Sequence, residues 1–205
     1  EIANSTRESK MINEILKYSF SDIFRMGFSF ILTKLFYPGA MLVRRPISIR
    51  QKRGFHYGKG LSTGKNCRIE IFGDGVIEMG DRCQIGDNTH LVSSQLVKIG
   101  NDCLFASKIF VSDTSHGSYG EDASSPLDLP NSRPLISDPV EIGDRVWLGE
   151  NVVVLGGVTI GEGSIVGAGS VVTKSLPANC IAVGSPARPI KRFNFDSKTW
   201  EKIPR

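Results

Sequence analysis

The 205-residue chain has few of the residues on which most reactive centres depend, and it lacks the usual cysteine motifs. It contains only three histidines and four cysteines, and no two cysteines form a C-x-x-C pair. Scattered cysteines of this kind predict buried, reduced thiols in a cytoplasmic protein. Aromatic residues are also scarce, at 8% of the chain against 22 glycines, a composition that favours many tight turns.

Long uninterrupted hydrophobic runs are missing as well. The most apolar stretch, residues 20–43, is broken by Asp22, Arg25, Lys34 and Pro38, so it does not predict a helix that spans a membrane. The first ten residues lack the apolar core of a signal peptide. We therefore expect a cytoplasmic protein.

The net charge of +4 is small, but the basic residues are concentrated in two places. Such runs form either a solvated face or a surface that attracts a phosphorylated cofactor, a lipid headgroup or an acidic glycan. No aromatic-interleaved basic strand or recognition-helix pattern accompanies them, so we expect no nucleic-acid partner. The two clusters are Arg44, Arg45, Arg50, Lys52 and Arg53, and in the tail Arg188, Lys191, Arg192, Lys198, Lys202 and Arg205.

A period of six residues dominates the chain from residue 79 onward. Six matches neither the helical period of about 3.6 nor the strand period of about 2. With glycine turns it predicts short strands that restart in the same orientation and stack as coils, each side burying one anchor. The anchors are Met79, Ile85 and Leu91, then after a two-residue slip Ile99, Phe105 and Val111, and downstream Ile142, Leu148, Val154, Ile160, Val166, Val172 and Ala178.

Three segments, IGDRVWLG, VTIGEGSIVGAGSVVTKSLP and AVGSPARPI, resemble the hexapeptide-repeat acetyltransferases. The motifs are similar to those of bacterial capsule and lipopolysaccharide sugar O-acetyltransferases and of the galactoside and maltose acetyltransferases. The resemblance covers roughly residues 60–192 and implies a mainly β fold, a left-handed parallel β-helix of triangular section with about five to six coils. It also implies acetyl-CoA as co-substrate and a homotrimer whose cofactor groove lies between subunits.

Two segments depart from the repeat. Residues 117–139, with four prolines, predict a functional loop extruded from the β-helix. Residues 1–58 predict one or two helices that end before Pro38 and either cap the open end of the β-helix or dock on a membrane surface; the two roles can coexist. We assign residues 59–192 to the β-helix domain and 193–205 to a C-terminal tail. Near one face of the predicted N-terminal helices lie Ile12, Ile15, Leu16, Ser19, Ile23 and Met26, and in looser register Phe30, Leu32 and Leu35.

His116 is the candidate catalytic residue because it stands where the repeat breaks into this loop, in the string DTSHGSY. An imidazole with an ordinary pKa near ~6.5 is available as a general base at physiological pH. The resembled family carries its catalytic histidine at this kind of site. Asp113 either orients His116, contacts the acceptor or caps a turn.

Four further residues are candidates for binding the substrate. Tyr119 follows His116 in the loop, and Asn88 and His90 lie in the preceding coil, where the resembled family often places a substrate contact. Trp147 is a large aromatic in a repeat otherwise filled by small residues. It forms either a wall of the site, against the pantetheine arm or the sugar, or only a subunit contact.

The remaining site residues follow from the resemblance alone. Gly149 and Ala168 would meet the pantetheine arm of acetyl-CoA, together with Trp147. Thr173 and Lys174 would lie nearer the nucleotide, and Arg188 and Lys191 would meet its phosphates.

The sequence therefore predicts an acetyl-CoA-dependent O-acetyltransferase that acts on a sugar hydroxyl, with surface polysaccharide as the expected product, a cytoplasmic location and possible attachment to the inner face of the membrane. The same fold also serves antibiotic- and amino-group acetyltransferases, non-catalytic scaffolds and the γ-class carbonic anhydrases. The last use three histidines on zinc, and His90 and His116 have no H-x-x-x-x-H partner, so we expect no metal.

Overall fold

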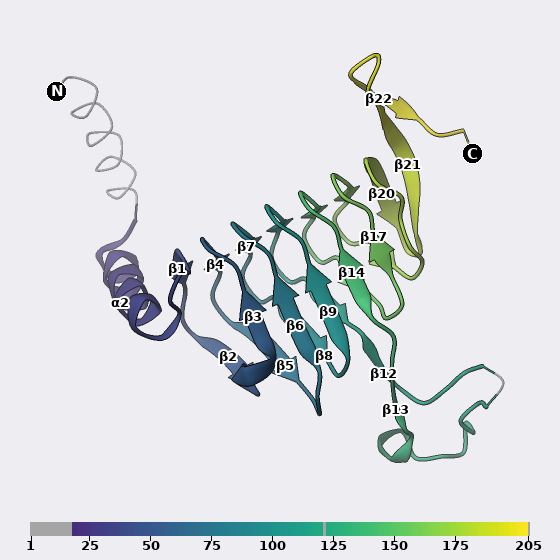
Figure 1. Cartoon of the computed structure of the whole chain (residues 1–205), viewed down its shortest axis with the longest axis horizontal. Coiled ribbons are helices and arrows are strands. Elements are labelled where there is room, and N and C mark those ends of the chain that lie inside the picture. The colour runs from purple at the N-terminus through teal and green to yellow at the C-terminus, as the bar shows by residue number, and fades with distance from the viewer. Residues whose placement is uncertain (1–17, 121, 205) are drawn as a thin grey trace.

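The chain forms a parallel β-helix of about seven turns, with helix α2 (Phe20–Phe36) before it and an antiparallel hairpin after it (Figure 1). The computed structural model describes residues 18–120 and 122–204. Strands from successive turns stack in register into three sheets, one on each side of the prism. Seven strands stacked at ~4.8 Å make a prism roughly 30 Å long.

The strands of the nine-stranded sheet are β1 (Leu42–Val43), β4 (Ser62–Thr63), β7 (Gln84–Ile85), β10 (Leu104–Phe105), β15 (Trp147–Leu148), β18 (Ile165–Val166), β20 (Cys180–Gly184), β21 (Ala187–Asn194) and β22 (Thr199–Lys202). The six-stranded sheet contains β2 (Ile47–Arg50), β5 (Cys67–Ile71), β8 (His90–Ser93), β11 (Phe110–Ser112), β16 (Val153–Val154) and β19 (Val171–Val172). The five-stranded sheet contains β3 (Phe55–Tyr57), β6 (Val76–Met79), β9 (Leu96–Ile99), β14 (Val140–Ile142) and β17 (Thr159–Ile160). A separate antiparallel pair joins β12 (Thr114–His116) to β13 (Leu135–Ser137).

We name each of the three edges of the prism after a glycine that lies on it in the downstream coils. The Gly149 edge joins the nine-stranded to the six-stranded sheet, the Gly156 edge joins the six-stranded to the five-stranded sheet, and the Gly161 edge closes the turn.

All the predicted anchors but one fill the interior, and Leu148, Ile160 and Val166 are fully buried. The exception is Ala178, which is half-buried; Leu176 takes the interior position beside Ile160, because the last side after Val172 is two residues shorter than the repeat. The six-residue period thus reports a triangular prism with one inward anchor on each side.

The β-helix begins upstream of residue 59, where the sequence placed its boundary. Parallel pairing already starts between β1 and β4 and between β2 and β5. The first coil departs from the repeat pattern: a 3-10 turn, Lys52–Gly54, forms its corner between β2 and β3. The structure consequently has more turns than the five to six expected.

Helix α2 (Phe20–Phe36) covers the open N-terminal end of the prism. Ser19 caps it by accepting a hydrogen bond from the backbone N–H of Asp22, and the helix ends before Pro38, as predicted. The Thr33 hydroxyl accepts from the backbone N–H of Val43 at 2.9 Å, which fastens α2 to β1. Of the predicted helical positions, Ile12, Ile15 and Leu16 lie outside the described residues, Ile23 and Met26 are half-buried, and Phe30 and Leu35 are exposed.

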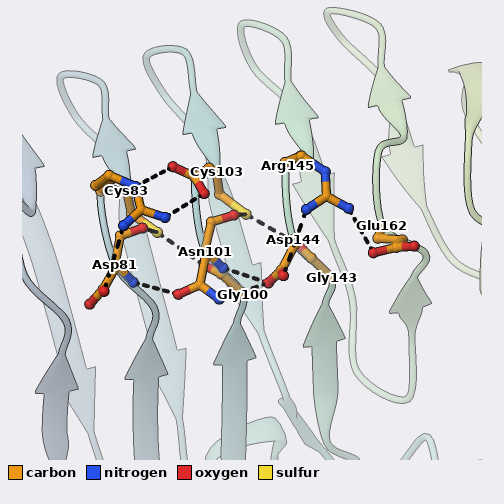
Figure 2. Close-up of polar contacts among 11 residues, drawn as sticks. Asp81, Cys83, Gly100, Asn101, Cys103, Gly143, Asp144, Arg145 and Glu162 are labelled. Carbon is orange, nitrogen blue, oxygen red and sulfur yellow. Dashed lines mark hydrogen bonds and ion pairs between the residues drawn. The ribbon is translucent and has the colours of Figure 1, made fainter.

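Side chains at the Gly161 edge bond each coil to the next (Figure 2). The backbone N–H of Asp81 donates to the Asn101 side chain at 2.8 Å, and that of Asn101 donates to Asp144 at 2.7 Å. A polar residue directly after the corner glycine therefore satisfies a backbone donor that the turn leaves unpaired. This explains the recurring Gly-Asp and Gly-Asn pairs without reference to a ligand.

All four cysteines are buried and free. The thiols of Cys83 and Cys103 donate to the carbonyls of Gly100 and Gly143, one coil further along (Figure 2). Burial raises the pKa of Cys67 to about 11. These cysteines act as small core residues, as expected.

Candidate functional site

The β12–β13 hairpin holds His116 at the Gly156 edge, at the base of the extruded loop (Figure 1). His116 is the last residue of β12, pairs with Leu135 and is exposed. Gly117 follows with a φ of +95°, and a side chain there would meet Ser124 and Arg133 at 3.0–3.1 Å. Only glycine fits this tight, left-handed turn, so the backbone beside His116 is fixed.

Tyr119 braces the same loop. Its hydroxyl donates to the backbone carbonyl of His116 at 2.6 Å and receives an N–H from Arg133 at 3.4 Å. The Tyr119 ring is exposed. The hydroxyl holds the backbone that carries His116, and a substrate contact by the ring stays a prediction.

The Asp113 carboxylate is buried beneath the hairpin and binds the turn at residues 93–96 of the coil below. It accepts hydrogen bonds at 2.8–2.9 Å from the Ser93 hydroxyl and from three backbone N–H groups, those of Ser94, Gln95 and Leu96. Among the described residues, the Asp113 carboxylate forms no hydrogen bond with His116. Of the three roles considered from the sequence, these bonds match the turn cap, and the other two stay predictions.

A cluster of three hydroxyls, which the sequence did not reveal, joins the hairpin to the coil below. The Ser94 hydroxyl is hydrogen-bonded to those of Thr114 and Ser137, and Thr114 is bonded to Ser137 at 3.2 Å. Ser94 and Ser137 are 43 residues apart. The pairing of β12 with β13 places Thr114 opposite Ser137, and the stacking of β14 on β9 brings the turn with Ser94 beside them, so no local sequence signal could have found the cluster.

His90 and Asn88 lie one coil upstream of His116, on the other edge of the six-stranded sheet. The His90 ring is bonded to the Glu70 carboxylate at 2.8 Å. The Arg68 guanidinium, and then His90, hold the pKa of Glu70 below its usual range. Asn88 occupies a corner with a φ of +57°, a left-handed conformation that asparagine tolerates well. Both residues thus have structural roles, and a substrate contact by either one stays a prediction.

Trp147 stands outward on β15, between Leu104 on β10 and Ile165 on β18. Trp147 and Leu104 are 46% and 44% exposed, so together they form an apolar strip on the nine-stranded sheet. At the adjoining edge, a side chain on Gly149 would come within 2.7 Å of the Ala168 backbone N–H. The Gly149 N–H donates to the Val166 carbonyl, and a contact of Gly149 or Ala168 with acetyl-CoA stays a prediction.

The other predicted cofactor residues lie towards the C-terminal end. Thr173 and Lys174 are exposed at the Gly156 edge, two coils beyond His116. Arg188 and Lys191 lie on β21, which leaves the prism as the first strand of the C-terminal hairpin (Figure 1). Within the described residues Lys174, Arg188 and Lys191 form no ion pair.

The predicted residues do not converge in one chain. His116, Thr173 and Lys174 belong to the Gly156 edge, whereas Gly149 and Ala168 belong to the Gly149 edge. The full width of the six-stranded sheet, roughly 13–20 Å for four to six residues, separates the two edges. Within one chain the two groups of predicted residues therefore lie on different edges of the prism.

Neither a metal cluster nor a membrane-spanning helix is found in the described part of the chain. No three His, Cys, Asp or Glu side chains there are grouped to hold a metal ion. No helix in residues 18–120 or 122–204 is long and apolar enough to cross a bilayer.

Three comparisons place the chain among known proteins. The family model described as bacterial transferase hexapeptide (six repeats) matches residues 139–174. The putative lipopolysaccharide biosynthesis O-acetyl transferase WbbJ of Escherichia coli (strain K12) is 42% identical over 188 residues, which are 91% of this chain and 96% of that protein. The crystal structure of AntD, an N-acyltransferase from Bacillus cereus, in complex with dTDP and 3-hydroxybutyryl-CoA, superimposes with a TM-score of 0.68 at 22% identity, over 82% of this chain and 89% of AntD.

Proposed function

The chain belongs to the bacterial hexapeptide-repeat transferases, and from that premise we propose that it transfers an acetyl group from acetyl-CoA to a hydroxyl of a sugar in a bacterial surface polysaccharide. The relative of 42% identity is named for lipopolysaccharide O-acetylation, and the two proteins match over nearly their whole lengths. The observation that carries the proposal is the exposed His116 on a braced hairpin at the edge of a rigid prism. A fixed base at the mouth of a groove is what direct transfer to a hydroxyl requires.

The reaction needs one base and a thiolate leaving group. The His116 imidazole takes the proton of the acceptor hydroxyl as the hydroxyl oxygen attacks the thioester carbonyl of acetyl-CoA. The carbon–sulfur bond then breaks, and the CoA thiolate leaves and takes the proton from the imidazolium. Transfer is direct, within a ternary complex, and Trp147, Gly149, Ala168, Thr173, Lys174, Arg188 and Lys191 bind the co-substrate.

The active assembly is a homotrimer with each site shared by two subunits. The separation of the Gly156 edge from the Gly149 edge in one chain supports this arrangement, because a neighbouring copy can bring one edge against the other. The exposed apolar strip around Trp147 and Leu104 supports it too, since an interface would cover it. Light scattering should report three chains per particle; an active monomer would contradict the shared site.

The protein associates peripherally with a membrane through α2. Five apolar residues of this helix recur at helical spacing and are each more than half exposed, on the side opposite the buried Ser29 and Thr33: Phe20, Phe24, Phe28, Ile31 and Leu35. Residues 18–65 contain nine Lys and Arg but only one acid, Asp22. An apolar helix face in a strongly basic segment suits an anionic bilayer surface. Wild type should sediment with phosphatidylglycerol vesicles, and a Phe20→Ser/Phe24→Ser variant that sediments equally well would refute this part.

The decisive experiment measures CoA release from acetyl-CoA with a panel of sugars and surface glycans. We expect His116→Ala to lower kcat by about 10²–10⁴-fold, because the hydroxyl then loses its proton without a positioned base. His56→Ala is the matched control, since His56 is also an exposed histidine but lies on β3 of the five-stranded sheet. If amines or antibiotics were acetylated but no sugar was, the acceptor would belong to a different chemical class from the one proposed. If His116→Ala were as active as the His56→Ala control, His116 would not be the base.

A further inference from the structure

A cationic cavity of about 220 Å³ lies between α2 and the start of the β-helix, away from His116. Its walls come from one face of α2, from the chain that follows β1 and from the Gly149 edge of the next two coils. A neighbouring hollow shares three of its basic residues. The charged side chains that line the cavity are Arg25, Arg44, Arg45, Lys65, Asp22 and Asp87.

The two carboxylates leave the cavity with an excess of positive charge. Asp87 accepts a hydrogen bond from the backbone N–H of Lys65 at 2.8 Å, and Asp22 accepts one from the Ser19 hydroxyl at 2.7 Å. Neither forms an ion pair with a basic residue of the cavity, and none of the four basic side chains has an ion-pair partner among residues 18–120 and 122–204. Four cations against two anions favour a doubly charged anionic ligand.

Arg45 carries a specific sign of a missing acceptor. Its Nε atom is buried and has no hydrogen-bond partner within the described chain. Its guanidinium lies 5.9 Å from the centre of the Tyr37 ring, a cation–π contact that uses none of its N–H donors. Buried N–H donors are normally satisfied, so an oxygen anion in the cavity would complete this side chain.

The cavity lies on the same edge of the prism as the predicted acetyl-CoA residues Gly149 and Ala168. Successive corners of this edge are linked by backbone hydrogen bonds, from Asn88 to Lys65, from Lys108 to Asp87 and from Asn151 to Ser107. Lys65 is thus three coils from the Gly149 corner, about 14 Å at ~4.8 Å per coil. That spacing leaves room for a sugar between a phosphate held in the cavity and a hydroxyl presented to the thioester.

We infer that this cavity binds the phosphate or diphosphate group that links the acceptor sugar to its carrier. The inference rests on the proposed sugar O-acetyltransferase function and narrows its substrate class to phosphate-linked sugars. Arg25, Arg44, Arg45 and Lys65 donate charge-assisted hydrogen bonds to the phosphate oxygens, and the sugar then extends along the Gly149 edge. The carrier-linked phosphate fixes how far the sugar reaches, and so which hydroxyl meets the thioester.

The test compares the full wild-type chain with an Arg25→Gln/Lys65→Gln variant. Neither side chain forms a hydrogen bond with the described residues, so the two substitutions should leave the fold intact. Lys59→Gln is the matched control: Lys59 lies in the same coil as Lys65, is exposed, and stands on the Gly161 edge. Calorimetry measures the affinity for inorganic pyrophosphate. Kinetics compare KM for a short-chain, water-soluble polyprenyl-diphosphate sugar with KM for the same sugar without phosphate.

We expect the double variant to weaken pyrophosphate binding at least about tenfold. The KM for the diphosphate-linked sugar, divided by the KM for the phosphate-free sugar, should rise by a similar factor. Lys59→Gln should leave both the affinity and this KM ratio unchanged. If Lys59→Gln lost as much pyrophosphate affinity as the double variant, binding would depend on the overall positive charge of the protein and not on this cavity, and the inference would be overturned. It would also be overturned by a double variant that loses binding to phosphatidylglycerol vesicles with an unchanged KM ratio, because the cavity would then hold a lipid headgroup. If pyrophosphate binds as predicted but no sugar is acetylated, the proposed function fails and the phosphate site stands.

Discussion

The regular coils of residues 147–172 and the interrupted coil of residues 104–142 have different roles in one prism. In the regular coils every side takes six residues, and Leu148, Val154 and Ile160 are wholly buried. In the interrupted coil the corner after β11 opens into the hairpin that carries His116, with the Asp113 carboxylate buried beneath it. Repetition builds the scaffold, and the departure from repetition positions the proposed base.

The largest effect on stability should come from a core anchor of the regular coils. Leu148→Ala removes a fully buried side chain that the stacked coils cannot replace, and it should lower the free energy of unfolding by about 2–5 kcal/mol. Urea unfolding monitored by circular dichroism measures this loss. Leu127→Ala is the control, because Leu127 is 92% exposed in the extruded loop and its loss should cost less than about 0.5 kcal/mol. Equal losses at the two sites would mean that the anchors do not hold the prism together.

In the interrupted coil the corresponding substitution is Asp113→Ala, which should cost both stability and activity. It leaves several buried donors of the 93–96 turn without an acceptor, at roughly 2–4 kcal/mol in total, and loosens the base of the hairpin. Asp113→Asn keeps one acceptor oxygen and should recover part of both losses. The pH profile of kcat separates two roles of Asp113. If Asp113 only positions the hairpin, its replacement lowers kcat by the same factor at every pH. If Asp113 orients the imidazole directly, its replacement also shifts the pH at which kcat changes.

The smallest effect concerns Glu70, on the upstream part of the six-stranded sheet. Its pKa is lower in the folded chain than in the unfolded chain, so its contribution to stability is present above the unfolded value near ~4.5 and is lost as the pH falls through the folded value. The Arg68–Glu70–His90 group is partly exposed, which limits the gain to less than about 1 kcal/mol. Thermal unfolding of wild type and Glu70→Gln should differ at pH 7 and converge once the pH falls below the pKa of Glu70 in the folded chain. Glu78→Gln, on the five-stranded sheet, is the control: its difference in thermal stability from wild type should not change between these two pH ranges.

Much of the candidate site was predictable because its signals are local. His116 stands at the break of the repeat, and the loop of residues 117–139 is visible from its prolines. The sequence could not show that Asp113 caps the turn at residues 93–96 or that Tyr119 braces the backbone of His116, because these contacts depend on how the hairpin folds back. The assignments of the cofactor residues came from family resemblance and stay predictions.

The sequence by itself determined the scaffold. A six-residue period with small residues at the corners leaves one compact solution, in which each apolar anchor points inward and each backbone strand pairs with the coil beside it. Only the tertiary structure decided which residues share an edge. The order of coils places Lys65 in line with Gly149 and sets both a sheet's width away from His116, because neighbours along the prism are about 20 residues or more apart in the chain. A periodic pattern specifies the anchors equally on all three sides, whereas the functional groups differ from edge to edge.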